Sequence, residues 1–301
     1  GPHTGLPFNS PAAHAGWAAG ASHSSRFPFV VLPEIETYVR HLRPYLLGRR
    51  VSYLEALWPG SIAVPDAETL KALLTGQRIE AVSRRGKFLS FSLDGGALLV
   101  HLRMTGRFRI EAAASPRQPH DRVIMGLDDG RELRFNDTRK FGRFYFVSDA
   151  ALVTANLGPE PLDETLTPAE FRERIRKRSG AVKPLLMNQT FLAGLGNIYT
   201  DEALFRARIH PLRKANTLTD EEITALFEAI RHVLQESIVY EGTSLDFVYT
   251  GGLREASAAY QSRLQVYGRA GEPCLRCGHI LERTVVGGRG THFCPQCQGN
   301  G

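Results

Sequence analysis

The segment Leu192-Ala-Gly-Leu-Gly-Asn-Ile-Tyr-Thr-Asp-Glu-Ala-Leu-Phe205 joins a glycine-rich turn to the start of a helical pattern. Gly194 and Gly196 predict a tight turn, and Asn197 is the first residue of the helical pattern. The first backbone N–H groups of a helix have no partner within it, so they form a favourable seat for a phosphate. An ordinary turn between two helices explains the same residues, and the rest of the chain has to distinguish the two interpretations.

The composition describes a multidomain protein with a modest excess of positive charge. The chain has 301 residues, 37 of them lysine or arginine and 31 acidic, with a net charge of +6; this length predicts two or three domains. No apolar run approaches the roughly 18 residues that a membrane span needs. Residues 1–29 lack the charged start of a signal peptide, and we expect a disordered tail, a cloning remnant or misassigned upstream translation. All cysteines lie between residues 274 and 297, which favours a reducing cytosol.

The first half of the chain predicts an α+β arrangement in which one helix precedes an antiparallel β-sandwich, together spanning residues 30–150. The helix is expected to begin at Leu32 and to end or kink at Pro44. Alternating apolar patterns then flank the turn signals Asp94-Gly95-Gly96 and Asp128-Asp129-Gly130. Each arrangement predicts a β-hairpin, and several short strands of this kind indicate a sandwich or a barrel.

The second half predicts a helical domain, residues 160–257, and a small ribbon, residues 259–299. Thr167 and Thr219 each begin a capping-box pattern, and the second one precedes a long amphipathic helix. Residues 242–257 have weak periodicity, and we expect a mobile loop there.

Two Cys-x-x-Cys pairs occupy the ribbon region and are separated by 16 residues. This spacing is typical of a tetrahedral zinc site on two knuckles joined by a hairpin. Two disulfides or a redox pair are the alternatives. Because four thiolates fill the coordination shell, the predicted Zn²⁺ is structural, and its expected ligands are Cys274, Cys277, Cys294 and Cys297.

The hairpin between the cysteine pairs presents one cation, Arg289, between glycines. A solvated loop arginine is the simplest interpretation, whereas a metal-clamped hairpin with an arginine at its tip suggests insertion into a groove. Strand alternation can also align basic residues along a phosphate backbone. The candidates in the strand region are Arg84, Arg85, Lys87, Arg103, Arg107, Arg109, Arg139, Lys140 and Arg143.

Met104 and Phe141 lie in two of these basic stretches. Such apolar residues most often belong to a core. An apolar residue at a turn within a basic run is also typical of a side chain that wedges between base steps. Both interpretations remain open from the residues alone.

In combination, these motifs resemble the formamidopyrimidine-DNA glycosylase and endonuclease VIII family of base-excision repair enzymes, closest to its oxidised-purine branch. The resemblance implies a β-sandwich, a helix–two-turn–helix domain and a zinc ribbon, with damaged duplex DNA in the cleft between the halves. It covers Leu32 to Gln298. The motifs are, in chain order, Leu32-Pro-Glu-Ile-Glu36, Arg85-Gly-Lys87, His101-Leu-Arg-Met-Thr-Gly106, Asn136-Asp-Thr-Arg-Lys-Phe-Gly142, Gly194-Leu-Gly-Asn-Ile-Tyr-Thr-Asp-Glu202 and the four-cysteine finger.

The resemblance also implies roles for individual residues. Lys87 and Arg289 would act at the catalytic site, and Glu202 would buttress the turn that contains Asn197. Lys183 would approach the flipped nucleotide, and Tyr249-Thr-Gly-Gly252 would cover it. The DNA contacts would come from His120, Arg139, Lys140, Lys183 and Asn197, with phosphates held by Lys87, Lys140, Asn197 and Arg289. The residues that fill the gap left by the flipped base would be Met104, Arg139 and Phe141.

The chain departs from the family at the expected nucleophile. The family attacks the sugar with the secondary amine of an N-terminal proline, assisted by the glutamate that follows it. Counted back from Leu32, these positions are Val30 and Val31. Arg103 also stands where a glycine is usual.

The implied function is excision of oxidised purines, such as 8-oxoguanine and formamidopyrimidine, followed by strand nicking at the abasic site. The protein would act as a monomer in the cytoplasm, with the chromosome. A lesion-binding protein of the same fold without catalysis is the main alternative. A zinc-ribbon protein of transcription or RNA binding explains the finger but not the Lys87, Phe141 and Asn197 motifs.

Overall fold

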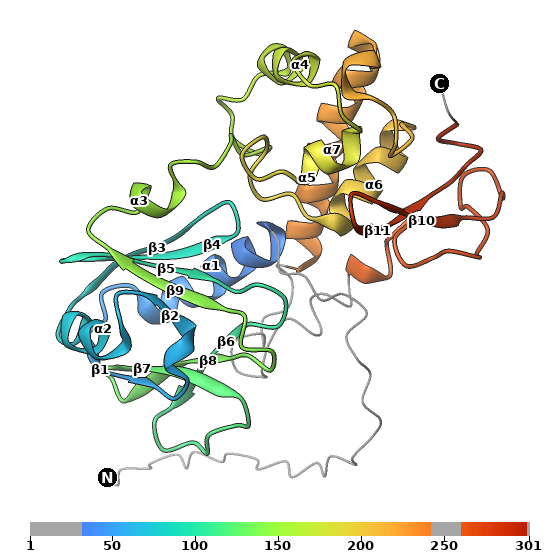
Figure 1. Cartoon of the computed structure of the whole chain (residues 1–301). Coiled ribbons are helices and arrows are strands. Elements are labelled where there is room, and N and C mark those ends of the chain that lie inside the picture. The colour runs from blue at the N-terminus through green and yellow to red at the C-terminus, as the bar shows by residue number, and fades with distance from the viewer. Residues whose placement is uncertain (1–31, 242–259, 300–301) are drawn as a thin grey trace, which may run out of the picture.

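The computed structural model describes residues 32–241 and 260–299, in which a β-rich domain lies beside a helical domain that carries a two-stranded ribbon (Figure 1). Val30, Val31, the tail before them and the expected loop that contains Tyr249-Thr-Gly-Gly252 lie outside the described residues. No helix in the described ranges is both long enough and apolar enough to cross a bilayer.

The β-rich domain is a sandwich of two sheets, as the sequence predicts. The first sheet is antiparallel and has the order β1 (Val51–Ala56), β7 (Asp121–Leu127), β8 (Arg131–Asn136) and β6 (Arg107–Ala112). The second has the order β2 (Ile62–Val64), β9 (Arg143–Val147), β5 (Gly96–His101), β4 (Phe88–Leu93) and β3 (Ile79–Arg85). Both predicted hairpins form, as β4–β5 and β7–β8. One edge departs from the antiparallel pattern, because β2 pairs parallel to β9.

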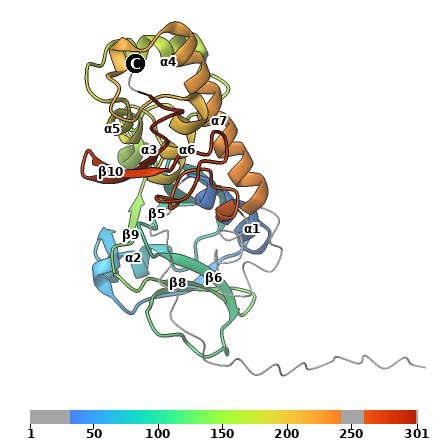
Figure 2. The same ribbon diagram turned by 90° about the vertical axis from the view of Figure 1, so that its right-hand side faces the viewer.

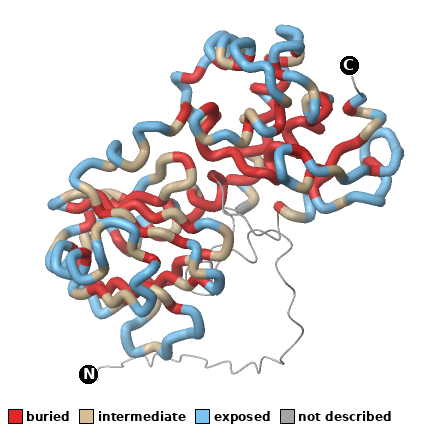
Figure 3. Tube along the Cα trace, viewed as in Figure 1, coloured by how far each residue is buried: buried red, intermediate tan, exposed pale blue. Residues whose placement is uncertain are grey.

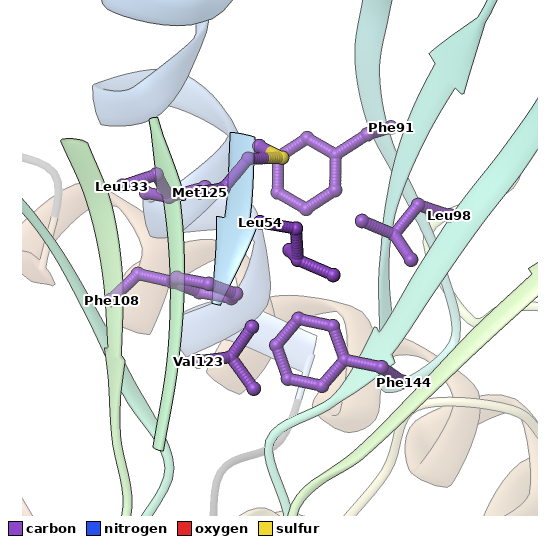
Figure 4. A pocket seen from close by; sticks show the side chains of 8 residues that line it. All are labelled: Leu54, Phe91, Leu98, Phe108, Val123, Met125, Leu133 and Phe144. Atoms are coloured by element: carbon purple, nitrogen blue, oxygen red, sulfur yellow. The ribbon is translucent and has the colours of Figure 1, made fainter. Parts of the chain in front are cut away.

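Apolar side chains from both sheets meet in the sandwich core (Figure 4). Phe91, Leu98 and Phe144 come from one sheet, and Leu54 and Phe108 come from the other. They surround a cavity of about 10 Å³ with an apolar lining. A space of this size and lining offers a water molecule no hydrogen-bond partners, so the core is closely packed and holds no ligand site.

Helix α1 (Leu32–Leu46) connects the two domains. Ile35, Tyr38 and Leu42 enter the sandwich core, and the helix also runs against α7 (Asp220–Glu241) of the other domain (Figure 2). Pro44 lies inside the last turn, and the helix ends two residues later at Leu46.

A short helix, α2 (Ala67–Leu74), interrupts the region in which alternation had suggested strands throughout. It is capped by Asp66, whose carboxylate accepts a hydrogen bond from Thr69 N. A 3₁₀ turn, η1 (Pro59–Ser61), precedes it.

The helical domain is organised around the long helix α7 (Asp220–Glu241). Its other helices are α4 (Pro168–Arg176), α5 (Val182–Met187), α6 (Asn197–Ala207) and the 3₁₀ turn η2 (Ala215–Thr217). The one-turn helix α3 (Ala151–Thr154) precedes this domain and contacts β9. Both predicted N-caps form: Thr167 accepts from Glu170 N, and Thr219 and Glu222 exchange reciprocal bonds. The apolar faces of these helices form a second core, separate from the sandwich core (Figure 3).

The ribbon consists of β10 (Glu282–Val286) and β11 (Arg289–Phe293), joined by Gly287 and Gly288. Both glycines have positive φ angles, +57° and +74°, which a tight two-residue hairpin turn requires. The ribbon is attached to the helical domain, because Arg276 donates to Phe205 O and Gln298 donates to Ile209 O. The turn that carries Arg289 is therefore mounted on a fixed base.

Candidate nucleic-acid interface

A cavity of about 550 Å³ opens where the two domains meet. The β-rich domain contributes Lys87, His101, Arg103, Met104, Phe141 and Arg143 to its lining; the rest of the chain contributes Met187, Gln189, Gly196, Asn197 and Arg289. Five residues expected from the sequence to act together, Lys87, Met104, Phe141, Asn197 and Arg289, are thus brought to one place. They come from both domains and from the ribbon, which no local sequence pattern could show.

The Gly194–Asn197 turn forms one wall of this cavity. Gly194 has a φ angle of +98°, and Asn197 is the first residue of α6. Gln189 holds the turn from within, accepting from Gly194 N and donating to Leu195 O. Leu32 N donates to Gly194 O over 3.1 Å, so the N-terminal end of α1 also lies at this turn. Sequence reasoning missed Gln189, since a polar residue in a loop carries no distinctive signal.

The electrostatics of the cavity favour an anionic ligand. Lys87 is half-buried. Its pKa is lowered to about 8, first by desolvation and then by repulsion from the nearby charge of Arg289. The charge of Arg103 lowers this pKa further, whereas the carboxylate of Glu34 raises it. Burial, with Arg103 and Lys87, lowers the pKa of His101 to about 3. His101 is therefore neutral at pH 7, and the positive charge comes from Lys87, Arg103, Arg143 and Arg289. Crowded cations whose charged forms are disfavoured are stabilised by a bound anion.

Arg139, Met104 and Phe141 form one cluster on the β-rich side, in which Arg139 and Phe141 are exposed and Met104 is half-buried. Arg139 Nη1 lies 3.3 Å from Met104 Sδ, and its guanidinium carbon is 4.8 Å from the centre of the Phe141 ring. Phe141 is 44 % exposed. This exposure is inconsistent with the core interpretation of Phe141 and leaves a large apolar surface available to a ligand.

Asp137 fixes the loop that carries this cluster. Its buried carboxylate accepts from Arg139 N (3.2 Å) and Gly142 N (2.8 Å), and also from the Thr105 hydroxyl next to Met104. The two loops with apolar tips are thereby held to each other. No sequence pattern indicates this role of Asp137, because an aspartate in a turn most often bonds only to its own loop.

His120 and Lys140 lie beside the same loop. His120 O accepts from Asp137 N, and its ring contacts Arg122. Lys140 has a positive φ of +60°, and its ammonium group lies 3.9 Å from the centre of the Trp58 ring, a cation–π contact. Neither residue lines the cavity, so any DNA contact that they make falls outside it.

Three of the basic residues expected to face a phosphate backbone are engaged within the protein. Arg84 and Arg85 pair with Glu160 in the segment between the domains, and Arg84 also pairs with Glu36. Arg109 is buried and makes a bidentate pair with Asp121. These three candidates therefore have carboxylate partners within the protein, which alternation along one strand does not reveal.

The structure also corrects the expectations for Lys183 and Glu202. Lys183 is fully buried and bonds to Asp201 and Thr291, so its ammonium group faces β11 just after Arg289 instead of a nucleotide. Glu202 accepts from the backbone N–H groups of Gln265, Val266 and Tyr267. Glu202 is therefore a structural residue, but it supports the segment that leads into the ribbon and not the Asn197 turn. Burial raises its pKa.

The four cysteines form a compact cluster in the ribbon. Their Sγ atoms all lie within 4.8 Å of one another, with Cys274 and Cys297 4.0 Å apart and Cys277 and Cys294 3.5 Å apart. A tetrahedral site with Zn–S bonds of about 2.3 Å separates its sulfurs by about 3.8 Å, whereas a disulfide needs about 2.05 Å. The cluster therefore fits one Zn²⁺ and does not fit two disulfides.

A β-sandwich, a helical domain with a glycine turn at an anion-attracting cavity, and a metal-clamped ribbon define the class of DNA glycosylases with a helix–two-turn–helix domain. The chain belongs to the formamidopyrimidine-DNA glycosylase family. Residues 31–144 match the model of its N-terminal domain, residues 157–248 match its H2TH domain, and residues 271–299 match the zinc finger found in FPG and IleRS. With this match, the cysteine cluster is a structural site for one Zn²⁺.

Individual relatives agree with the family models. The chain is 46 % identical over 271 residues to formamidopyrimidine-DNA glycosylase of Herpetosiphon aurantiacus, and 45 % identical over 273 residues to that of Geobacillus kaustophilus; each match covers 89 % of this chain and 98 % of the relative. Lactococcus lactis Fpg in complex with abasic-site DNA has a TM-score of 0.83 and 39 % identity. MutM in complex with DNA containing carbocyclic 8-oxo-G has a TM-score of 0.81 and 39 % identity. Both structures cover 90 % of this chain and are themselves covered in full.

Proposed function

We propose that this protein binds damaged duplex DNA in the cavity between its domains and serves the excision of oxidised purines, 8-oxoguanine and formamidopyrimidine. The observation that carries the proposal is the convergence of Lys87, Asn197 and Arg289 on one cavity that Met104 and Phe141 also line. The complexes of the relatives with abasic-site DNA and with 8-oxo-G DNA support the same substrate class.

In this proposal two groups of residues at the cavity have different tasks. Lys87, Arg289 and the helix start at Asn197 hold backbone phosphates, which fixes the position of the duplex without reading its sequence. Met104, Arg139 and Phe141 enter the stack where a base has left it. Flipping a base costs a few kcal/mol, and apolar side chains that fill the gap offset part of this cost.

Excision requires an amine that attacks C1′ of the damaged nucleotide. The nitrogen forms a bond to C1′ as the N-glycosidic bond breaks, and the purine leaves with the bonding electron pair and takes up a proton. The nitrogen then loses its proton, the C1′–O4′ bond breaks with O4′ taking up a proton, and a Schiff base forms at C1′. Loss of a proton from C2′ then expels the 3′ phosphate by β-elimination, which nicks the strand. In the family this amine belongs to an N-terminal proline, and the position of Leu32 at the Gly194 turn supports delivery of the amine from the residues ahead of Leu32.

At the two positions ahead of Leu32 this chain carries Val30 and Val31, whose side chains neither attack nor transfer protons. We therefore propose that the chain in this form binds lesions and excises them poorly, and that Pro-Glu directly before Leu32 restores excision. This makes a catalytically impaired lesion-binding protein the second candidate function. Lys87 is an alternative amine, because a pKa of about 8 leaves about a tenth of it neutral at pH 7.

Binding and nicking assays on matched duplexes test the proposal. Duplexes with 8-oxoguanine, with an abasic site and without damage are compared in fluorescence anisotropy and on denaturing gels. Preferential binding of the two damaged duplexes is expected. Equal affinity for all three would contradict the proposed substrate class. We also propose that the protein acts as a monomer on chromosomal DNA. The proposed compartment is a reducing cytosol, which the clustering of all four cysteines at one metal site supports.

A further inference from the structure

Lys183 and Asp201 form an ion pair that is completely removed from solvent. Lys183 Nζ lies 2.6 Å from Asp201 Oδ1, and both side chains are 0 % exposed. The pair joins α5 to α6. Burying two charges is costly unless their remaining hydrogen-bonding groups are satisfied, so the other partners of the pair indicate what it holds in place.

Those other partners are three consecutive residues of the ribbon. Lys183 Nζ also donates to Gly290 O (3.2 Å) and to Thr291 Oγ1 (2.7 Å). Asp201 Oδ2 accepts from His292 N (2.8 Å). The ion pair thus grips β11 at the residues that directly follow Arg289.

Two neighbouring contacts fix the same hairpin from the sides. Asn197 Nδ2 donates to Gly290 O over 2.9 Å, which ties the start of α6 to the hairpin. A Cβ atom at Gly287 would lie 2.9 Å from Pro184 Cγ, so the hairpin tip packs directly on α5. Arg289 itself is exposed and lines the cavity with Lys87 and Asn197.

We propose that Lys183 and Asp201 are positioning residues, whose buried ion pair sets the hairpin so that Arg289 is held in the cavity beside Asn197. The inference rests on the proposed function in one respect, namely that duplex DNA occupies this cavity. In this role neither Lys183 nor Asp201 contacts DNA, and both act through the position of Arg289. It also explains why an ammonium group expected near a nucleotide is buried behind the hairpin.

A double-mutant cycle tests the proposal, because a residue that acts through Arg289 loses its effect once Arg289 is gone. The pair variant Lys183→Met/Asp201→Asn removes both charges, leaves the net charge unchanged and keeps an acceptor for His292 N. It is compared with wild type, with Arg289→Ala and with the triple variant. The probe is a duplex with a tetrahydrofuran abasic analogue, and the readouts are Kd by anisotropy, zinc content and Tm. The matched control is Arg176→Met/Asp220→Asn, which removes an exposed ion pair of the same domain.

The pair variant and Arg289→Ala are each expected to weaken binding by about tenfold or more, the scale of one hydrogen bond to a charged group. The triple variant is expected to bind no more weakly than Arg289→Ala, and the control to bind like wild type. If the pair variant does not fold, Thr291→Val takes its place, because it removes one hydrogen bond of Lys183 and leaves the ion pair intact. Thr291→Val is expected to weaken DNA binding less than the pair variant, and to have no effect on binding once Arg289 is replaced by alanine.

Full addition of the losses, or wild-type affinity in both the pair variant and Thr291→Val, overturns the positioning role. These outcomes leave the proposed function standing as long as wild type binds the damaged duplex. Failure of wild type to bind it overturns both.

Discussion

Leu32 N donates a hydrogen bond to Gly194 O over 3.1 Å, which brings the first described residue of the chain to the turn that opens α6. The approach is close enough that a Cβ atom at residue 194 would lie 2.5 Å from Leu32 Cδ1. Gly194 also has a φ angle of +98°, a conformation that only glycine adopts readily. The cavity wall and the start of α1 therefore depend on one glycine.

Replacing Gly194 tests this dependence. Gly194→Ala is expected to lower the free energy of unfolding by about 1–3 kcal/mol, through backbone strain and contact with Leu32, and to weaken DNA binding. Chemical denaturation measures the change. Gly180→Ala is the matched control, since a Cβ at Gly180 meets nothing within 4 Å. Equal stability of the two variants would show that the turn tolerates a side chain.

The proposed division between phosphate contacts and the base-stack wedge predicts different specificities for two variants. Asn197→Ala is expected to weaken binding to damaged and undamaged duplexes alike, because phosphates carry no lesion information. Phe141→Ala is expected to weaken binding to abasic duplexes selectively, by about 1–3 kcal/mol, the scale of one lost base–aromatic contact. Anisotropy titrations on both duplexes measure this, and identical losses from both variants would contradict the division.

The low pKa of Lys87 predicts a pH dependence of DNA affinity. Its pKa of about 8 leaves the ammonium form dominant at pH 7 and the neutral amine dominant at pH 9. A phosphate contact requires the charged form, so affinity is expected to be constant below about pH 8 and to fall above it, by up to about tenfold at pH 9. Lys87→Arg remains charged throughout and is expected to remove this decline. An unchanged decline in Lys87→Arg would assign it to another group.

Removal of zinc is expected to act through Arg289. Cys277→Ser should lower the metal content below one equivalent, loosen the hairpin and weaken DNA binding while the sandwich stays folded. Metal analysis, anisotropy and near-UV circular dichroism follow these three properties. Full DNA affinity in the zinc-free protein would show that the clamp does not need the metal.

The features that were predictable from the sequence have local causes. The Asp-Gly turns fix the two hairpins, the threonine caps start α4 and α7, and the cysteine spacing indicates the metal cluster. The features that were missed depend on partners distant in the chain. Arg109 has Asp121 across the sheet, and Lys183 has Thr291 on the ribbon. Both cations are buried with these partners and do not face a ligand. A pattern in the sequence alone does not reveal partners that are distant in the chain.

Borohydride trapping on an abasic duplex tests the central claim, that the cavity is a glycosylase site that lacks only the N-terminal proline amine. The chain with residues 1–29 and Val30-Val31 is compared with a form that lacks residues 1–29 and carries Val30→Pro and Val31→Glu. The second form is expected to give a trapped covalent complex and a nicked strand, and the first to give at least about 100-fold less of both. Equal trapping by the two forms, unchanged by Lys87→Ala, would contradict the account and place the nucleophile elsewhere.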